Sequence, residues 1–148
     1  MKILIVCLGN ICRSPIAHGV MQHLVNQEGL NWEIDSAGTG GWHIGQMPDY
    51  RSIEVAKKHG INISDQKARK FNALDFQNFD LIYVMDKNNY ADVVSLTNDV
   101  NERAKVQLFI KDEAVPDPYT DDAMFDPVYQ LISAQCEKLL QSLKKENS

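Results

Sequence analysis

The sequence predicts an α/β fold, a single domain over residues 1–148 built on a parallel β-sheet with helices on both faces. Short apolar runs of strand length alternate with longer segments of helical periodicity along the chain. The first of these strand runs is continuously apolar, which is typical of a strand buried on both faces. The length of 148 residues is close to the most common domain size, so we expect one hydrophobic core.

The first strand is expected over Ile3–Val6, an uninterrupted apolar run. A helix should follow, with Ser14 as its N-cap and Pro15 in its first turn. Its apolar residues trace one helical face: Ile16, Val20, Met21, Leu24 and Val25.

The next elements continue the alternation. A second strand is expected over Trp32–Ser36, and a helix over Tyr50–His59 that Gly60 would end. A third strand is expected over Leu81–Met85, and Asp86 should cap the short helix behind it.

The last strand is expected over Val106–Ile110, before a long helix whose N-terminus Asp126 and Pro127 would cap. The apolar residues of this helix recur every three or four positions, which also places Cys136 in the core: Phe125, Val128, Tyr129, Ile132, Cys136, Leu139, Leu140 and Leu143.

Composition excludes several classes of protein. Fifteen basic and 20 acidic residues give a net charge of −5, which argues against nucleic acid as a partner. No apolar stretch approaches the roughly 18 residues of a membrane helix, so we expect no membrane insertion. Gly9 interrupts the N-terminal apolar run too early for a signal peptide. Three cysteines are too few for a secreted disulfide scaffold, which favours the cytoplasm.

Residues 7–14, C-L-G-N-I-C-R-S, carry the clearest chemical signal. Cys7 ends the first strand, at the edge of the sheet where ligands bind in such folds. Gly9 and Asn10 tolerate positive φ, which would turn backbone N–H groups toward an anion. Arg13 offers a planar fork for two phosphate oxygens. A thiol at a helix N-terminus beside an arginine loses its proton readily and becomes a nucleophile. The alternative is a structural cysteine at a strand end, which would not need the arginine.

Three further residues have a functional and a structural interpretation. Asp117 precedes Pro118, which favours an extended conformation; it is either a catalytic acid or a turn residue. Trp42 lies in a glycine-rich loop and forms either a pocket wall or part of the core. Cys12 either has no role or protects Cys7 as a disulfide. The four histidines lack metal-ligand spacing, so no metal is expected.

The stretch Val6–Pro15 resembles the phosphate-loop signature of the low-molecular-weight protein tyrosine phosphatases. Further segments match in order: D-S-A-G-T from residue 35, G-W-H-I-G at 41–45, D-Y-R at 49–51, H-G-I at 59–61, M-D-K-N-N at 85–89 and V-P-D-P-Y at 115–119. The resemblance, to a bacterial-type member, implies a four-stranded parallel sheet in the order 2-1-3-4 with five helices. It also implies hydrolysis of phosphotyrosine through a phosphocysteine, without metal or other cofactor.

The same resemblance implies roles for individual residues. The catalytic residues would be the nucleophile Cys7, the phosphate clamp Arg13 and the general acid Asp117. Asn10 would shape the loop, and Ser14 would stabilise the thiolate. The substrate-binding residues would be Leu8, Gly9, Asn10, Ile11, Cys12, Ser14, Trp42 and Tyr119. Tyrosine-phosphorylated proteins are the implied partners, with a tyrosine autokinase as one candidate.

Two other functions are weighed against this one. An arsenate reductase of the same architecture would need two more cysteines in mid-chain, and the sequence has none between Cys12 and Cys136. A phosphate-binding module without turnover would not need both a thiol and an acid facing one anion.

Overall fold

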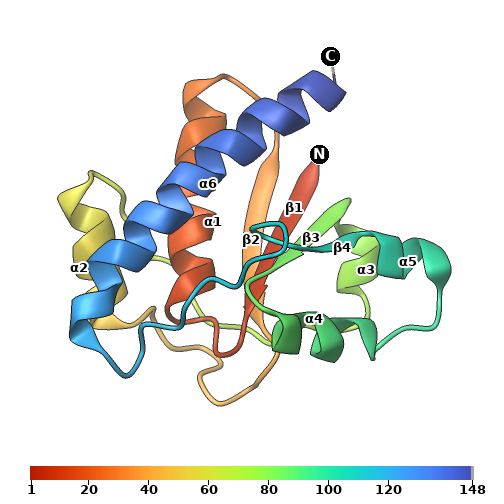
Figure 1. Cartoon of the computed structure of the whole chain (residues 1–148), viewed down its shortest axis with the longest axis horizontal. Helices are drawn as coiled ribbons and strands as arrows, with labels where there is room; N and C mark the ends of the chain where they lie inside the picture. The colour runs from red at the N-terminus through yellow and green to blue at the C-terminus, as the bar shows by residue number, and fades with distance from the viewer. Residues whose placement is uncertain (148) are drawn as a thin grey trace.

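A computed structural model describes residues 1–147 of the chain (Figure 1). Its centre is a four-stranded parallel sheet in the order β2-β1-β3-β4, which confirms the predicted fold class and strand order. The strands are β1 (Lys2–Cys7), β2 (Glu33–Gly38), β3 (Leu81–Val84) and β4 (Val106–Leu108).

Six α-helices and one 3₁₀ turn surround the sheet in the described part of the chain. The implied number of five is therefore too low; the two shortest helices, α3 and α5, span four and five residues. The sequence pattern predicted only the other four helices, because segments as short as α3 and α5 do not show helical periodicity. The helical elements are α1 (Arg13–Gln27), α2 (Tyr50–Lys58), α3 (Asp75–Asn78), α4 (Lys87–Val94), α5 (Val100–Ala104), η1 (Asp122–Met124) and α6 (Phe125–Glu146).

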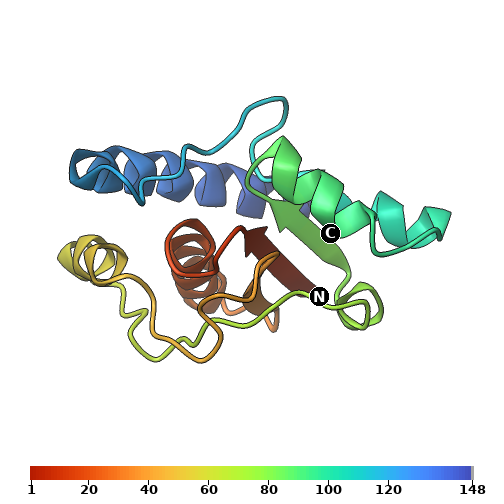
Figure 2. The same ribbon diagram turned by 90° about the horizontal axis from the view of Figure 1, so that it is seen from below.

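Side chains of β1 alternate between two apolar layers. Ile3 and Ile5 face the larger layer, which contains residues of α1, α2 and α6. Leu4 and Val6 face the smaller one, which contains residues of α3 and α4. Helix α6 packs along α1 (Figures 1 and 2). All four of these side chains are fully buried, which explains why the run is continuously apolar.

Two predicted helix caps are wrong, and one is confirmed. Helix α1 begins at Arg13 with Cys12 as its N-cap residue, and Ser14 lies inside the first turn. Helix α6 begins at Phe125, so Asp126 lies in its first turn rather than at the cap. Asp86 does cap α4, because its side chain accepts a hydrogen bond from the Asn89 N–H.

Gly38, the last residue of β2, lies against the loop that follows β1. It pairs with Cys7 across the sheet, and a Cβ atom at this position would lie 2.9 Å from the Leu8 carbonyl oxygen. It would also lie 3.0 Å from the carbonyl carbon of Gly9. Only a residue without a side chain lets the two backbones approach so closely.

We expect Gly38→Ala to lower the free energy of unfolding by about 1–3 kcal/mol, the usual cost of overpacking. Urea unfolding would measure it. Gly41→Ala is the matched control, since its added methyl group would meet only side-chain atoms 3.4 and 3.5 Å away. Equal stability of the two variants would contradict the steric argument.

Candidate active site

Residues 8–12 connect β1 to α1, and Asn10 determines the shape of this loop. Its φ of 57° lies in the left-handed region, which asparagine tolerates better than most residues. The buried side chain fixes this conformation: Nδ2 donates to the hydroxyls of Ser14 (2.8 Å) and Ser36 (3.0 Å), and Oδ1 accepts from the Arg69 N–H (3.0 Å). Such strain persists only where surrounding contacts enforce it.

Cys7 ends β1 at the base of this loop and is buried. Its sulfur lies 3.0 Å from the Ser14 hydroxyl oxygen. Because that oxygen already accepts a hydrogen bond from the Asn10 amide, the hydroxyl proton is available for the sulfur. The Ser14 side chain is therefore oriented to stabilise a thiolate, which explains why it does not cap the helix.

Arg13 is 3% exposed, and its guanidinium is held in one orientation. One nitrogen, Nη1, donates to the Asp86 carboxylate and to the Val115 carbonyl, both at 2.9 Å. The other oxygen of Asp86 caps α4. A buried cation needs such a paired charge, because an uncompensated one is strongly destabilising.

Asp117 reaches the same point from a loop far along the chain. Its Oδ2 lies 3.8 Å from Nη2 of Arg13, and its Oδ1 accepts from the Tyr119 N–H at 3.1 Å. The Asp117 carboxylate therefore stabilises a turn, as its structural interpretation predicted, and it also faces Arg13, as a catalytic acid would. Its side chain is 45% exposed, so it can exchange protons with water.

A hollow of about 160 Å³ brings most of the predicted residues together. Asn10 and Ser14 are buried outside its lining. Trp42 is 68% exposed, so the core interpretation of this residue is wrong. His43 is a lining residue that the sequence did not predict. The lining comprises Cys7, Leu8, Gly9, Ile11, Cys12, Arg13, Trp42, His43, Asp117 and Tyr119.

Arg51, near the start of α2, holds the Tyr119 side of the hollow. Its guanidinium bonds to Asp49 at 2.9 Å and to Asp122 at 2.6 Å. It also lies 5.5 Å from the ring centroid of Tyr119 and 4.4 Å from that of Phe125, within cation–π range. The only sequence signal at Arg51 is that it belongs to D-Y-R, one of the segments that resemble the family, and this resemblance assigned no role to it.

Three residues that support the site were also missed as site residues: Ser36, Arg69 and Asp86. Ser36 and Arg69 hold the Asn10 side chain, and Asp86 holds Arg13. Ser36 and Asp86 fall inside segments that resemble the family, D-S-A-G-T and M-D-K-N-N. The Arg69 side chain is held in turn by ion pairs with Asp35 and Asp75.

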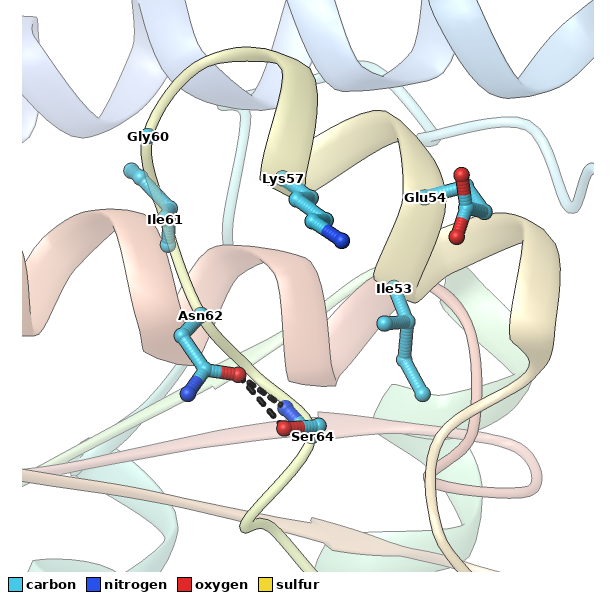
Figure 3. Close-up of a pocket in the computed structure, with 7 residues that line it drawn as sticks. All are labelled: Ile53, Glu54, Lys57, Gly60, Ile61, Asn62 and Ser64. Atoms are coloured by element: carbon cyan, nitrogen blue, oxygen red, sulfur yellow. Dashed lines mark hydrogen bonds between the residues drawn. The ribbon is translucent and has the colours of Figure 1, made fainter.

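A wider hollow of about 550 Å³ lies beside α2 and the segment after it (Figure 3). Its polar side chains include Asn62, which accepts hydrogen bonds from the N–H and the hydroxyl of Ser64. Its lining contains no cysteine, histidine or arginine, so the Cys7 thiol and the Arg13 guanidinium belong to the smaller hollow alone. Within residues 1–147 no cluster of three or more metal-ligating side chains occurs. No helix of that part has the length and apolarity of a membrane span.

Comparison with known proteins agrees with this geometry. The family model "Low molecular weight phosphotyrosine protein phosphatase" matches residues 2–148. The chain belongs to the low molecular weight phosphotyrosine protein phosphatase family. It is 41% identical to the human phosphatase of that name, over 95% of this chain and 94% of the human one.

Solved structures of related proteins have the same fold. YfkJ from Bacillus subtilis superposes with a TM-score of 0.92 at 37% identity, over 100% of this chain and 97% of that one. Wzb from Vibrio vulnificus, solved in complex with benzylphosphonate, gives a TM-score of 0.87 at 30% identity, over 95% and 97% of the two chains.

The three cysteines of this phosphatase are free thiols in different surroundings. Cys12 lines the hollow beside Cys7; burial, followed by the negative charge of Asp49, raises the pKa of its thiol to about 12. Cys136 is fully buried in α6, as predicted, and its sulfur lies 3.8 Å from the Ala17 carbonyl oxygen. Burial raises the pKa of this thiol as well.

We expect mild peroxide to inactivate the protein reversibly through a Cys7–Cys12 disulfide. Peroxide oxidises the Cys7 thiolate to a sulfenic acid, and Cys12 then displaces water. Because the pKa of Cys12 lies far above neutral, its thiolate fraction grows about tenfold per pH unit. The yield of disulfide over higher oxides should therefore rise with pH.

Mass spectrometry of peroxide-treated protein at pH 6 and pH 8.5 measures this yield. The Cys12→Ser variant should lose activity irreversibly, whereas a thiol reductant should restore the unmodified protein. Equal recovery of both proteins would refute the protective bond.

Proposed function

We propose that the protein hydrolyses phosphotyrosine and related aryl phosphate monoesters through a phosphocysteine intermediate on Cys7. The observation that supports it most is the convergence of three groups on one hollow: the Cys7 thiol, the buried Arg13 guanidinium and the Asp117 carboxyl. A phosphate-binding module would need the cation alone. The thiol supplies a nucleophile, and the carboxyl supplies a proton.

In the first step the Cys7 thiolate attacks phosphorus and the bond to the phenolic oxygen breaks. Arg13 and the N-terminus of α1 stabilise the phosphoryl oxygens. The leaving oxygen belongs to a phenol of pKa about 10 and departs poorly as an anion. Asp117 in its protonated form donates to that oxygen, so tyrosine leaves neutral.

In the second step a water molecule attacks the phosphorus of the phosphocysteine. Asp117, now a carboxylate, takes the proton of the water. The sulfur–phosphorus bond breaks, and sulfur departs as a thiolate that the Ser14 hydroxyl, at 3.0 Å, stabilises. Inorganic phosphate is released, and the enzyme returns to its first state with Asp117 protonated.

Trp42 and Tyr119 would determine the substrate class. Both are exposed aromatic side chains in the lining of the hollow, and apolar contact along a flat ring favours an aryl ester over a short alkyl one. The benzylphosphonate held by the Vibrio vulnificus relative supports an aryl ligand here.

Tyrosine-phosphorylated proteins are the substrates that this chemistry fits, and a tyrosine autokinase is our candidate among them by family analogy. We place the protein in the cytoplasm, since its three cysteines are free and a reducing compartment keeps thiols in that state. An arsenate reductase is disfavoured, because Cys136 lies in the core instead of at the site.

The deciding experiment measures phosphate release from matched phosphotyrosine and phosphoserine peptides in the presence of a metal chelator. We expect kcat/KM to favour phosphotyrosine, and Cys7→Ser to abolish turnover in a protein that still folds. Binding of phosphate without turnover would support the module instead, and residual activity of Cys7→Ser would rule out the phosphocysteine. Arsenate-dependent oxidation of a thiol reductant would indicate the reductase.

Asp117→Asn should impose a penalty that depends on the leaving group. With phenyl phosphate the first step should slow by about 10²-fold or more, the scale of general acid catalysis. With para-nitrophenyl phosphate the penalty should shrink, because that leaving group departs unaided as an anion. Single-turnover kinetics across aryl phosphates of graded leaving-group pKa would reveal a steeper dependence for the variant. Parallel dependences would limit Asp117 to a role in loop structure.

A further inference from the structure

His18, on the second turn of α1, is a histidine that the proposed chemistry does not use. Its Nδ1 lies 3.1 Å from the hydroxyl oxygen of Ser36, and neither residue belongs to the lining of the hollow. Ser36 in turn accepts from Asn10, and Asn10 donates to Ser14, whose hydroxyl faces Cys7. An unbroken series of hydrogen bonds thus joins α1, β2 and the nucleophile.

The direction of each hydrogen bond follows from the groups involved. The Asn10 amide nitrogen only donates, so the oxygens of Ser14 and Ser36 both accept from it. Each hydroxyl therefore keeps one proton to donate. Ser14 has the Cys7 sulfur at 3.0 Å, and Ser36 has Nδ1 of His18 at 3.1 Å. A neutral ring with its proton on Nε2 completes the series as an acceptor.

The surroundings of the ring favour that neutral form. Burial, the largest effect, lowers the pKa of His18; the Asp35 carboxylate opposes this, and the Arg69 guanidinium adds to it. A backbone hydrogen bond with Ile34 also raises the pKa of His18 and has the smallest effect. Asp35 is itself held by an ion pair with Arg69, so its charge is partly neutralised.

We propose that His18 is a positioning residue of the phosphatase, acting by accepting the Ser36 hydroxyl proton. This acceptance fixes the Ser36 oxygen toward the Asn10 amide, which fixes the Asn10 side chain and aims the Ser14 proton at Cys7. The proposal rests on the proposed role of the Cys7 thiolate. Without an acceptor at residue 18, the hydroxyl of Ser36, a residue that is only 5% exposed, would be an unsatisfied buried donor. Its rotation toward another acceptor would loosen Asn10.

Three variants separate hydrogen-bond acceptance from packing. His18→Leu removes the acceptor. His18→Asn keeps one, because the asparagine Oδ1 falls close to the position of Nδ1 in the histidine. His23→Leu is the matched control on the same helix, where the side chain is exposed. Each variant is assayed with para-nitrophenyl phosphate for kcat and KM. The pH midpoint of iodoacetate alkylation is measured at Cys7 by mass spectrometry.

For His18→Leu we expect the alkylation midpoint to rise by about 0.5–1 pH unit, the effect of weakening one hydrogen bond to a charged group. We expect kcat to fall about three- to tenfold, with KM nearly unchanged because the phosphate contacts remain. His18→Asn and His23→Leu should match the unmodified protein in both measurements. A residue that serves only packing would not move the alkylation midpoint.

A double-mutant cycle with Ser36→Ala completes the test. Once Ser36 is alanine, His18→Leu should cause no further change, and Ser36→Ala alone should raise the midpoint in a protein that loses only a hydroxyl. That variant decides the outcome if His18→Leu does not fold.

The proposal is overturned by an unchanged midpoint in His18→Leu or Ser36→Ala, by equal impairment of His18→Asn and His18→Leu, or by additive effects in the cycle. Activity that survives Cys7→Ser would instead overturn the proposed function, so the two failures are distinguishable.

Discussion

The left-handed conformation of Asn10 is the constraint on which the site depends. Five residues must lead the chain from the end of β1 into α1 while Cys7 and Arg13 face the same small volume. Asn10 has positive φ in this short connection, and the three hydrogen bonds of its side chain stabilise it there. Those bonds come from α1, from β2 and from the segment before α3. The shape of the loop is therefore determined by the packing of the sheet as well as by its own sequence.

The surroundings of Arg13 meet two opposing requirements: the guanidinium must be held in one orientation, and it must still attract a phosphate. The chain has a net charge of −5, so attraction of a phosphate dianion has to be local. Asp86 and Asp117 both reduce the positive potential of the guanidinium. Asp86 compensates by fixing the guanidinium, since one of its oxygens also binds the backbone of α4. Asp117, once protonated for its role as an acid, no longer opposes the phosphate.

The sequence predicts local features well and long-range partners poorly. The apolar runs and their alternation with helical segments located all four strands, with their ends displaced by at most two residues. Residues 7–14 suggested the nucleophile and the clamp, because those groups lie within one loop. Ser36, Arg51 and Asp86 act on the site through the register of the sheet and the path of distant loops, so their roles do not follow from hydrophobic periodicity or from the spacing within one loop. The prediction of Ser14 as the N-cap was wrong, because its hydroxyl is directed at the sulfur of Cys7, at the end of the preceding strand, and not at a backbone N–H of the helix.

The exposure of the two reacting groups differs in the direction that their chemistry requires. Cys7 is 3% exposed, at the base of a loop held by the Asn10 hydrogen bonds, where a thiolate keeps its orientation. The Asp117 side chain is 45% exposed, on a loop held by Val115 and by the contact of Tyr119 with Arg51. An acid that alternates between protonated and ionised forms in each cycle needs this access to water, whereas the nucleophile needs a fixed position. The same architecture therefore assigns the rigid, buried end of β1 to the covalent step and an exposed, tethered loop to proton transfer.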